Sequence, residues 1–190
     1  MKAAIMGYGT IGSGVYEVLD RNCKIVEKKA GEPIEVKYIL DLREFPGTPI
    51  EKLVIHDVKT IVDDPEIGIV VETMGGTTPA YEFVKSCLLA GKHVVTSNKA
   101  LVAAHGTELI RIAAEKNVSF LFEASVGGGI PIIRPLVECL GGEEIEEISG
   151  ILNGTTNYIL TKMNEEGWSF EEALKHAQEL GYAERNPEAD

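Results

Sequence analysis

The chain has 190 residues, of which 44% are hydrophobic and 25% are charged, the balance of a soluble globular protein with room for one domain and part of another. Its formal net charge of −12 argues against nucleic acid or an anionic membrane as a partner, because both bind clustered lysine and arginine. The sequence has no apolar run that could span a bilayer and no secretory leader, so we expect a cytoplasmic protein.

The cysteines Cys23, Cys87 and Cys139 are far apart, and no C-x-x-C pair occurs. This spacing favours neither a zinc site nor a disulfide framework. Cys87 and Cys139 lie in apolar helical patterns, so we expect both to be small core residues. The four histidines, which lie on different predicted elements, show no metal or triad spacing, and we interpret them as structural: His56, His93, His105 and His176.

Short apolar runs alternate with helical patterns over the first two thirds of the chain. The expected strands span residues 3–6, 36–40, 67–71, 93–96 and 118–122. The expected helices span residues 13–19, 79–90 and 108–115. This alternation predicts an α/β protein with a parallel sheet covered on both faces, and the right-handed crossover rule favours the Rossmann-type doubly wound fold.

The pattern changes after Glu123. A glycine-rich turn over 125–131 leads into an expected helix over 132–140 and an expected strand over 145–152. A helix over 157–165 follows, and Ser169 with Glu172 forms a capping box for a last helix that ends near 180. We therefore predict a domain boundary near Ile130, with one domain over 1–130 and part of a second α/β domain over 131–190.

The motif G-x-G-x-x-G occurs at residues 7–12, directly between an expected strand and an expected helix. In this setting Gly7 permits the tight turn, Gly9 lets the backbone approach a pyrophosphate, and Gly12 allows close packing of helix and strand. The free N–H groups and the positive dipole end of the helix that follows would then face the anionic diphosphate. The motif predicts a dinucleotide site, and the alternative is an ordinary glycine-rich turn.

The second strand ends near Asp41 and Arg43, where a dinucleotide's adenosine ribose is expected. Asp41 would accept hydrogen bonds from both ribose hydroxyls and so favour NAD, whereas Arg43 would pair with a 2′-phosphate and so favour NADP. The two signals conflict, and either residue is also compatible with a plain surface position.

Polar stretches follow three of the expected strands, at residues 72–77, 96–99 and 123–129. Lys99 is the basic residue among them, suited to a substrate carboxylate, a developing alkoxide or proton transfer, and alternatively to a solvated surface. Glu123 with Val126 and Gly128 could hold a hard cation, although a Glu–backbone hydrogen bond is the simpler interpretation. The acidic stretch 182–190 is suited to a substrate ammonium group or to a loose tail.

Several of these stretches together resemble the homoserine dehydrogenase family in order and spacing. The matching segments are residues 7–12, 72–76, 91–100, 123–131, 150–160 and 177–184. The resemblance implies a homodimeric enzyme that interconverts L-homoserine and L-aspartate 4-semialdehyde with NAD(P)(H), and it implies that 131–190 is part of a substrate and dimerisation domain.

The resemblance also implies residue roles. The glycine motif, including Thr10 and Ile11, would hold the cofactor, and Thr73 and Lys99 would lie beside its nicotinamide, with Lys99 in proton movement. The sodium site that the resemblance implies consists of Glu123, Val126, Gly128 and Ile130. The substrate contacts that it implies are Thr155, Tyr182 and Glu184.

The chain departs from the family pattern in two places. Leu40 stands where the family often has an arginine, and Arg185 and Asn186 replace a usual acidic pattern. The resemblance further implies a helix with a catalytic Asp and Lys beyond residue 190, so we expect these 190 residues alone to bind cofactor poorly and to turn over slowly. The alternatives are a non-catalytic dinucleotide-binding module, a related amino-acid dehydrogenase and a purely structural dimerisation role.

Overall fold

The structure of the chain is a computed structural model that describes residues 1–151 and 153–183. It divides into two compact units, Met1–Cys139 and a second unit that begins at Leu140. The boundary near Ile130, expected from the change of sequence pattern, remains a prediction, since the compact units reflect packing alone. No helix among the described residues is both long and apolar enough to cross a membrane.

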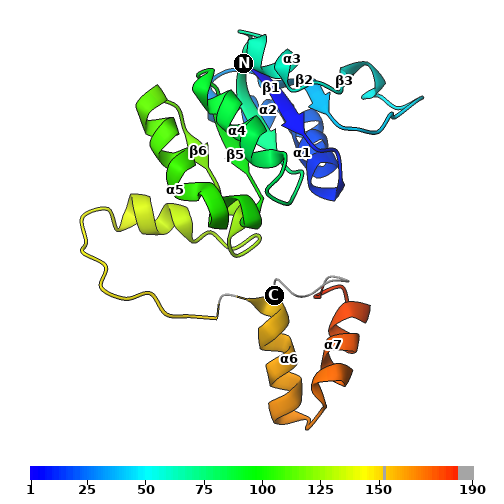
Figure 1. The fold of residues 1–190 in the computed structure, drawn as a ribbon, viewed down its shortest axis with the longest axis vertical. Helices are drawn as coiled ribbons and strands as arrows, with labels where there is room; N and C mark the ends of the chain where they lie inside the picture. Colours follow the sequence, from blue (N-terminus) through cyan, green and yellow to red (C-terminus); the bar gives the residue numbers. More distant parts are fainter. Residues whose placement is uncertain (152, 184–190) are drawn as a thin grey trace. The chain divides into compact units, whose positions relative to one another are not determined.

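The first unit is a parallel sheet with helices on its faces (Figure 1). Its strands are β1 (Lys2–Met6), β2 (Glu35–Leu40), β3 (Val54–Ile55), β4 (Ile67–Glu72), β5 (His93–Thr96) and β6 (Phe120–Leu121). Its α-helices are α1 (Thr10–Arg21), α2 (Cys23–Ala30), α3 (Lys59–Asp63), α4 (Ala80–Leu89) and α5 (Lys99–Lys116). Short 3-10 turns occur at Glu51–Leu53 and Glu123–Ser125, and a π-helical stretch occupies Pro135–Cys139.

The strand order is β3-β2-β1-β4-β5-β6, and every neighbouring pair is parallel. The predicted doubly wound fold is therefore confirmed. The order reverses beside β1, because the chain first adds β2 and β3 on one side of it and then crosses to add β4 on the other. Ligands of open α/β sheets bind at this reversal, outside the carboxyl ends of the strands.

Apolar residues of both faces of the sheet are buried, which explains its continuous apolar strands. Ala4 and Met6 of β1 pack in one cluster with Val84 of α4 and Leu109 of α5. Ile5, between them in sequence, belongs to a second cluster that includes residues of α1. The alternation follows from the two-residue side-chain period of a strand, and it gives each sheet face its own helical cover.

The second unit contains α6 (Gly154–Glu165) and α7 (Phe170–Glu179), which lie side by side as an antiparallel pair (Figure 1). Ile159 of α6 packs with Ala173 and Ala177 of α7 in a small buried cluster. The expected capping box is confirmed, because the Ser169 hydroxyl accepts from the Glu172 N–H and the Glu172 carboxylate accepts from the Ser169 N–H.

Two expectations were wrong, and two were met only in part. Residues 145–151 form no strand, because a strand needs a partner for its backbone groups and the described chain pairs none with this segment. The helix expected over 132–140 is present over residues 133–139 but is irregular: it starts with an α-type bond from the Leu136 N–H to the Ile132 carbonyl oxygen and continues as the π-helical stretch Pro135–Cys139. Cys139 is exposed, although Cys87 is buried as expected. The last expected strand of the sheet is confined to β6.

Candidate functional site

A cleft of about 560 Å³ opens at the carboxyl ends of β1, β2 and β4, where the strand order reverses. Its lining includes five of the residues predicted to bind cofactor: Gly7, Gly9, Asp41, Arg43 and Thr73. Met74, Pro79 and Phe83 supply an apolar wall. Thus the topology brings together residues that the sequence separates by more than sixty positions, in the place where such folds hold ligands.

The three motif glycines differ in what surrounds them. Gly7 has φ +93°, which disfavours any residue with a Cβ, and a Cβ there would lie 3.1 Å from the Met74 backbone. A Cβ on Gly12 would lie 2.0 Å from the Gly7 carbonyl oxygen, so close helix–turn packing requires glycine. A Cβ on Gly9 would meet no atom within 4 Å, which means that this position faces open space. The reasons expected for Gly7 and Gly12 are confirmed; the reason expected for Gly9, close approach of a ligand, remains a prediction.

Helix α1 begins directly at this open position. Gly9 is its N-cap residue and offers no side-chain cap, and the Ser13 N–H makes a helix-type bond to the Gly9 carbonyl oxygen at 2.9 Å. The N–H groups of the first turn precede that bond and have no intrahelical acceptor. With no acidic residue in the first turn, this end of the helix is suited to an anion. Thr10 and Ile11 belong to this turn, and both are exposed.

Asp41 and Arg43 form one ion pair against the glycine turn. Each Asp41 oxygen accepts two hydrogen bonds: Oδ1 from the Arg43 N–H and Nε, and Oδ2 from the Tyr8 N–H and Arg43 Nη2. The hydrogen bonds from Arg43 are the main cause that lowers the pKa of Asp41 well below its usual value. Arg43 Nη2 also donates to the Tyr8 carbonyl oxygen, yet 60% of the side chain remains exposed. The pair is therefore part of the cleft wall rather than independent surface.

Thr73 fastens the β4 loop to the glycine turn. Its hydroxyl donates to the Gly7 carbonyl oxygen at 2.8 Å, and its N–H donates to the Met6 carbonyl oxygen at 2.9 Å. Lys99 is exposed and is the first residue of α5. A cation at a helix N-terminus is repelled by the helix dipole, which costs about 0.3–1 kcal/mol of helix stability. Helix stability therefore does not explain a lysine at this position.

Below these loops lies a carboxyl group that the sequence did not single out as a site residue. Glu72 is 0% exposed, and Oε2 accepts from the Thr96 hydroxyl at 2.5 Å. Its Oε1 accepts from the Met74 N–H at 2.8 Å. The sequence placed Glu72 only in the polar stretch 72–77 that follows a strand. The signal that could have found it is an acidic residue directly continuing a buried apolar strand, which is rare without partners.

Glu123 stabilises its own loop. Its Oε1 accepts from the Ile132 and Ile133 N–H groups, and its Oε2 accepts from the Arg134 N–H at 2.7 Å. These backbone hydrogen bonds, led by that of Ile132, lower the pKa of the carboxyl group. The structure thus supports the simpler alternative, a Glu–backbone anchor. Gly128 and Ile130 of the same loop are exposed, Val126 is half-buried, and the described residues contain no cluster of three or more His, Cys, Asp or Glu suited to a metal.

In the second unit the structure brings two predicted substrate residues together. The Thr155 hydroxyl donates to the Tyr182 carbonyl oxygen at 2.6 Å, and the Tyr182 ring lies against that of Tyr158. Thr155 is buried, whereas Tyr182 is exposed. Glu184, the third of these residues, lies outside the described residues.

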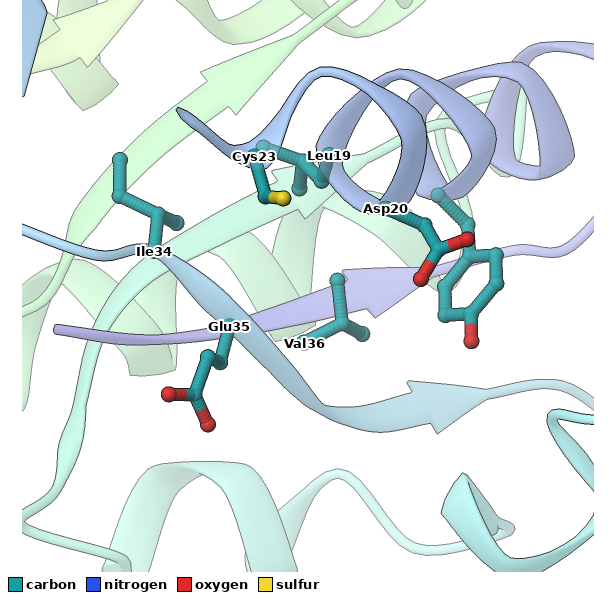
Figure 2. Close-up of a pocket in the computed structure, with 7 residues that line it drawn as sticks. Leu19, Asp20, Cys23, Ile34, Glu35 and Val36 are labelled. Atoms are coloured by element: carbon teal, nitrogen blue, oxygen red, sulfur yellow. The ribbon is translucent and has the colours of Figure 1, made fainter. Parts of the chain in front are cut away.

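A smaller cavity of about 240 Å³ lies between α1 and β2 (Figure 2). Figure 2 shows Asp20 and Glu35 beside it, together with Leu19 and Val36. Two acidic side chains and no lining lysine or arginine make this cavity unsuited to a dinucleotide's phosphates. The larger cleft is consequently the candidate cofactor site.

Comparison with known proteins agrees with this geometry. The model described as "Homoserine dehydrogenase, NAD binding domain" matches residues 7–123, and the model described as "Homoserine dehydrogenase" matches residues 131–190. The chain belongs to the homoserine dehydrogenase family. The earlier resemblance is therefore confirmed, and the first unit contains the family's NAD-binding domain.

Individual relatives cover the whole chain. Homoserine dehydrogenases of Synechocystis sp. and Pseudomonas aeruginosa are 48% and 45% identical over 195 aligned positions, which include 100% of this chain and 44% of each relative. A crystal structure of the Thiobacillus denitrificans enzyme has a TM-score of 0.87 at 43% identity, covering 98% of this chain and 44% of that one. A hyperthermophilic archaeal homoserine dehydrogenase in complex with NADPH has a TM-score of 0.84 at 30% identity, covering 100% of this chain and 64% of that one. The chain spans less than half the length of the curated relatives it matches.

Proposed function

We propose that this chain forms the cofactor-binding portion of a homoserine dehydrogenase, which interconverts L-homoserine and L-aspartate 4-semialdehyde with NAD(P)(H) in amino-acid biosynthesis. The observation that carries the proposal is the open position at Gly9, at the uncapped start of α1 and in a cleft at the strand-order reversal. Family membership and the archaeal relative in complex with NADPH support it.

The residues present fit a dinucleotide. Gly9, Thr10, Ile11 and Gly12 would offer backbone N–H groups to the diphosphate, and Gly7 shapes the turn that precedes them. Thr73 and Lys99 would lie at the nicotinamide half. When bound, the nicotinamide supplies or accepts the hydride. In the reductive direction the aldehyde oxygen gains a proton and becomes the homoserine hydroxyl, and we assign Lys99 Nζ to the movement of that proton.

Between the two cofactors, the wall at Asp41 and Arg43 favours NADP. Both Asp41 oxygens already accept two hydrogen bonds from the chain, which leaves little capacity for ribose hydroxyls. The Arg43 guanidinium is mostly exposed and is suited to a 2′-phosphate.

The remaining assignments rest on the family resemblance, except the cytoplasmic location and the domain division, which rest on the sequence pattern. We infer a substrate site at Thr155, Tyr182 and Glu184, a homodimer, a cytoplasmic location, and the domain division at residue 130. We also retain a sodium ion at Glu123 and at the backbone of Val126, Gly128 and Ile130. For that ion Glu123 would use Oε2, which accepts only the hydrogen bond from the Arg134 N–H and so keeps acceptor capacity, whereas Oε1 already accepts two.

Gly9→Ala tests the cofactor site, with Gly14→Ala as its matched control on the same helix. A methyl group at either position meets no protein atom within 4 Å, so both variants are expected to fold. Gly14→Ala should keep or slightly raise the melting temperature, and Gly9→Ala should lower it slightly, because alanine is a poorer N-cap residue than glycine. Because the Gly9 methyl group would occupy the diphosphate position, Gly9→Ala should weaken NADPH binding about tenfold or more, whereas Gly14→Ala should not. Equal affinities of the two variants, measured by NADPH fluorescence titration, would contradict the proposal.

A further inference from the structure

Glu72 is buried at the carboxyl end of β4, and its side chain holds together two separate stretches of chain. On one side it accepts from the Met74 N–H in the loop after β4. On the other it accepts from the Thr96 hydroxyl at the end of β5 and from Asn98 Nδ2 at 3.3 Å. The Glu72 carbonyl oxygen adds a fourth bond, from the Ser97 N–H. No lysine or arginine is among these partners, so the cluster is a hydrogen-bond network rather than an ion pair.

The same network defines the start of α5. The Thr96 hydroxyl, which donates to Glu72, accepts from the Asn98 N–H at 2.9 Å. Asn98 is 5% exposed; its Oδ1 caps α5 by accepting from the Leu101 N–H, and its Nδ2 donates to the Gly76 carbonyl oxygen at 2.6 Å. Lys99 follows directly as the first residue of the helix. The orientation of Asn98, and through it the beginning of α5 at Lys99, therefore depends on Glu72.

The loop held on the other side lines the cleft. Thr73 contacts the glycine turn, and Met74 and Gly75 line the cleft itself. Gly75 and Gly76 both have positive φ, at +79° and +67°, so the loop has a backbone path that few residues adopt and that needs fixing by contacts. The carboxyl of Glu72 is the group that joins this loop to the start of α5.

We propose that Glu72 is a positioning residue for the nicotinamide half of the cofactor site, joining the Thr73–Gly76 loop and Lys99 into one rigid piece. The proposal rests on the proposed function, which places the nicotinamide beside Thr73 and Lys99. Glu72 is buried and lines no part of the cleft, so it acts through these neighbours and not by contact with the ligand.

The test compares NADPH with ADP-ribose 2′-phosphate, which is NADPH without its nicotinamide, on the full chain. In Glu72→Leu the Met74 N–H and the Asn98 amide lose their buried acceptor, a loss that is expected to weaken NADPH binding about tenfold. Binding of ADP-ribose 2′-phosphate should change less than about twofold, because the glycine turn and Arg43 are untouched. Glu72→Gln keeps an acceptor and should restore most of the NADPH affinity.

Lys92→Met is the matched control for loss of a buried polar group. Lys92 is 3% exposed and donates to the Asp64 and Ile67 carbonyl oxygens at the opposite end of the sheet. This variant should lower the melting temperature and leave the ratio of the two affinities unchanged. If Glu72→Leu does not fold, Thr96→Val against Thr96→Ser tests the same network, because only serine retains the hydroxyl between Glu72 and Asn98.

The outcomes separate the two proposals. If the unsubstituted chain binds neither ligand, the proposed function fails, and the inference fails with it. Suppose instead that the unsubstituted chain binds both ligands. If the Glu72 or Thr96 variants then lower the two affinities equally, or lower neither, the cofactor site stands and the positioning role of Glu72 is overturned. Selective loss of NADPH affinity, with rescue by Gln or Ser, supports it.

Discussion

The first unit buries its apolar side chains, whereas the segment that follows it leaves them exposed. In the first unit Ile5, Val84 and Leu109 are fully buried on the two faces of one sheet. In the stretch from 140 to 151 every residue is exposed, including Ile145, Ile148 and Ile151. The contrast shows that apolar content alone does not make a core: the first unit pairs each strand with a neighbour, whereas 140–151 has no paired strand.

The largest effect is expected when a methyl group is added at a glycine in each region. Gly12→Ala would place a Cβ 2.0 Å from the Gly7 carbonyl oxygen, and we expect a loss of about 3 kcal/mol or more in the free energy of unfolding. Gly150→Ala meets no atom within 4 Å and should change that free energy by less than about 0.5 kcal/mol. Urea unfolding of both variants measures the difference; similar losses would show that the two regions are packed alike.

A smaller effect is expected from the capping box of α7. Ser169→Ala removes the hydroxyl that accepts from the Glu172 N–H, which should cost about 1 kcal/mol and speed amide exchange in α7 about fivefold. Because α6 and α7 have their own small cluster, amides of the first unit should keep their protection. Ser169→Asp, which retains a capping acceptor, is the control. Equal loss of protection in both units would contradict their independence.

The smallest expected effect concerns the loop that Glu123 anchors, and it depends on pH. The pKa of Glu123 is lowered by backbone hydrogen bonds, so its stabilising contribution is present above the unfolded pKa of about 4.3 and is lost as pH falls through the folded value. Glu123→Gln should therefore lower the melting temperature at pH 7 and have progressively less effect below pH of about 4. Glu138→Gln, which breaks only an exposed pair with Arg134, should have little effect at either pH. A Glu123→Gln loss that is the same at both pH values would be evidence against this anchor.

The two regions also differ in how far the sequence predicts them. The strands near Ile5, Val70 and Val94 were found because buried parallel strands read as short apolar runs, and the glycine motif was found because its context is local. The strand expected over 145–152 failed because pairing is a long-range property that periodicity does not contain. The short elements α2, β3 and α3 were not predicted, since each is too brief or too polar for a periodic signal.

The candidate site shows the same division. Residues that act through their backbone near a motif, such as Gly7 and Gly12, were predictable from spacing. The pairing of Asp41 with Arg43 against Tyr8 was not, because it depends on where the β2 loop lies relative to the glycine turn. Glu72 was overlooked for a similar reason: its partners Thr96 and Asn98 lie more than twenty positions away and meet it only through the pairing of β4 with β5.

The most direct test of the central claim is an amide NMR titration of the chain with NADPH, which also detects weak binding. If the start of α1 holds the diphosphate, the signals of Gly9, Thr10 and Ile11 should shift first and most, followed by those of the β2 and β4 loops that line the cleft. If NADPH shifts other amides and leaves those of Gly9 and Thr10 unchanged, the cleft is not the dinucleotide site.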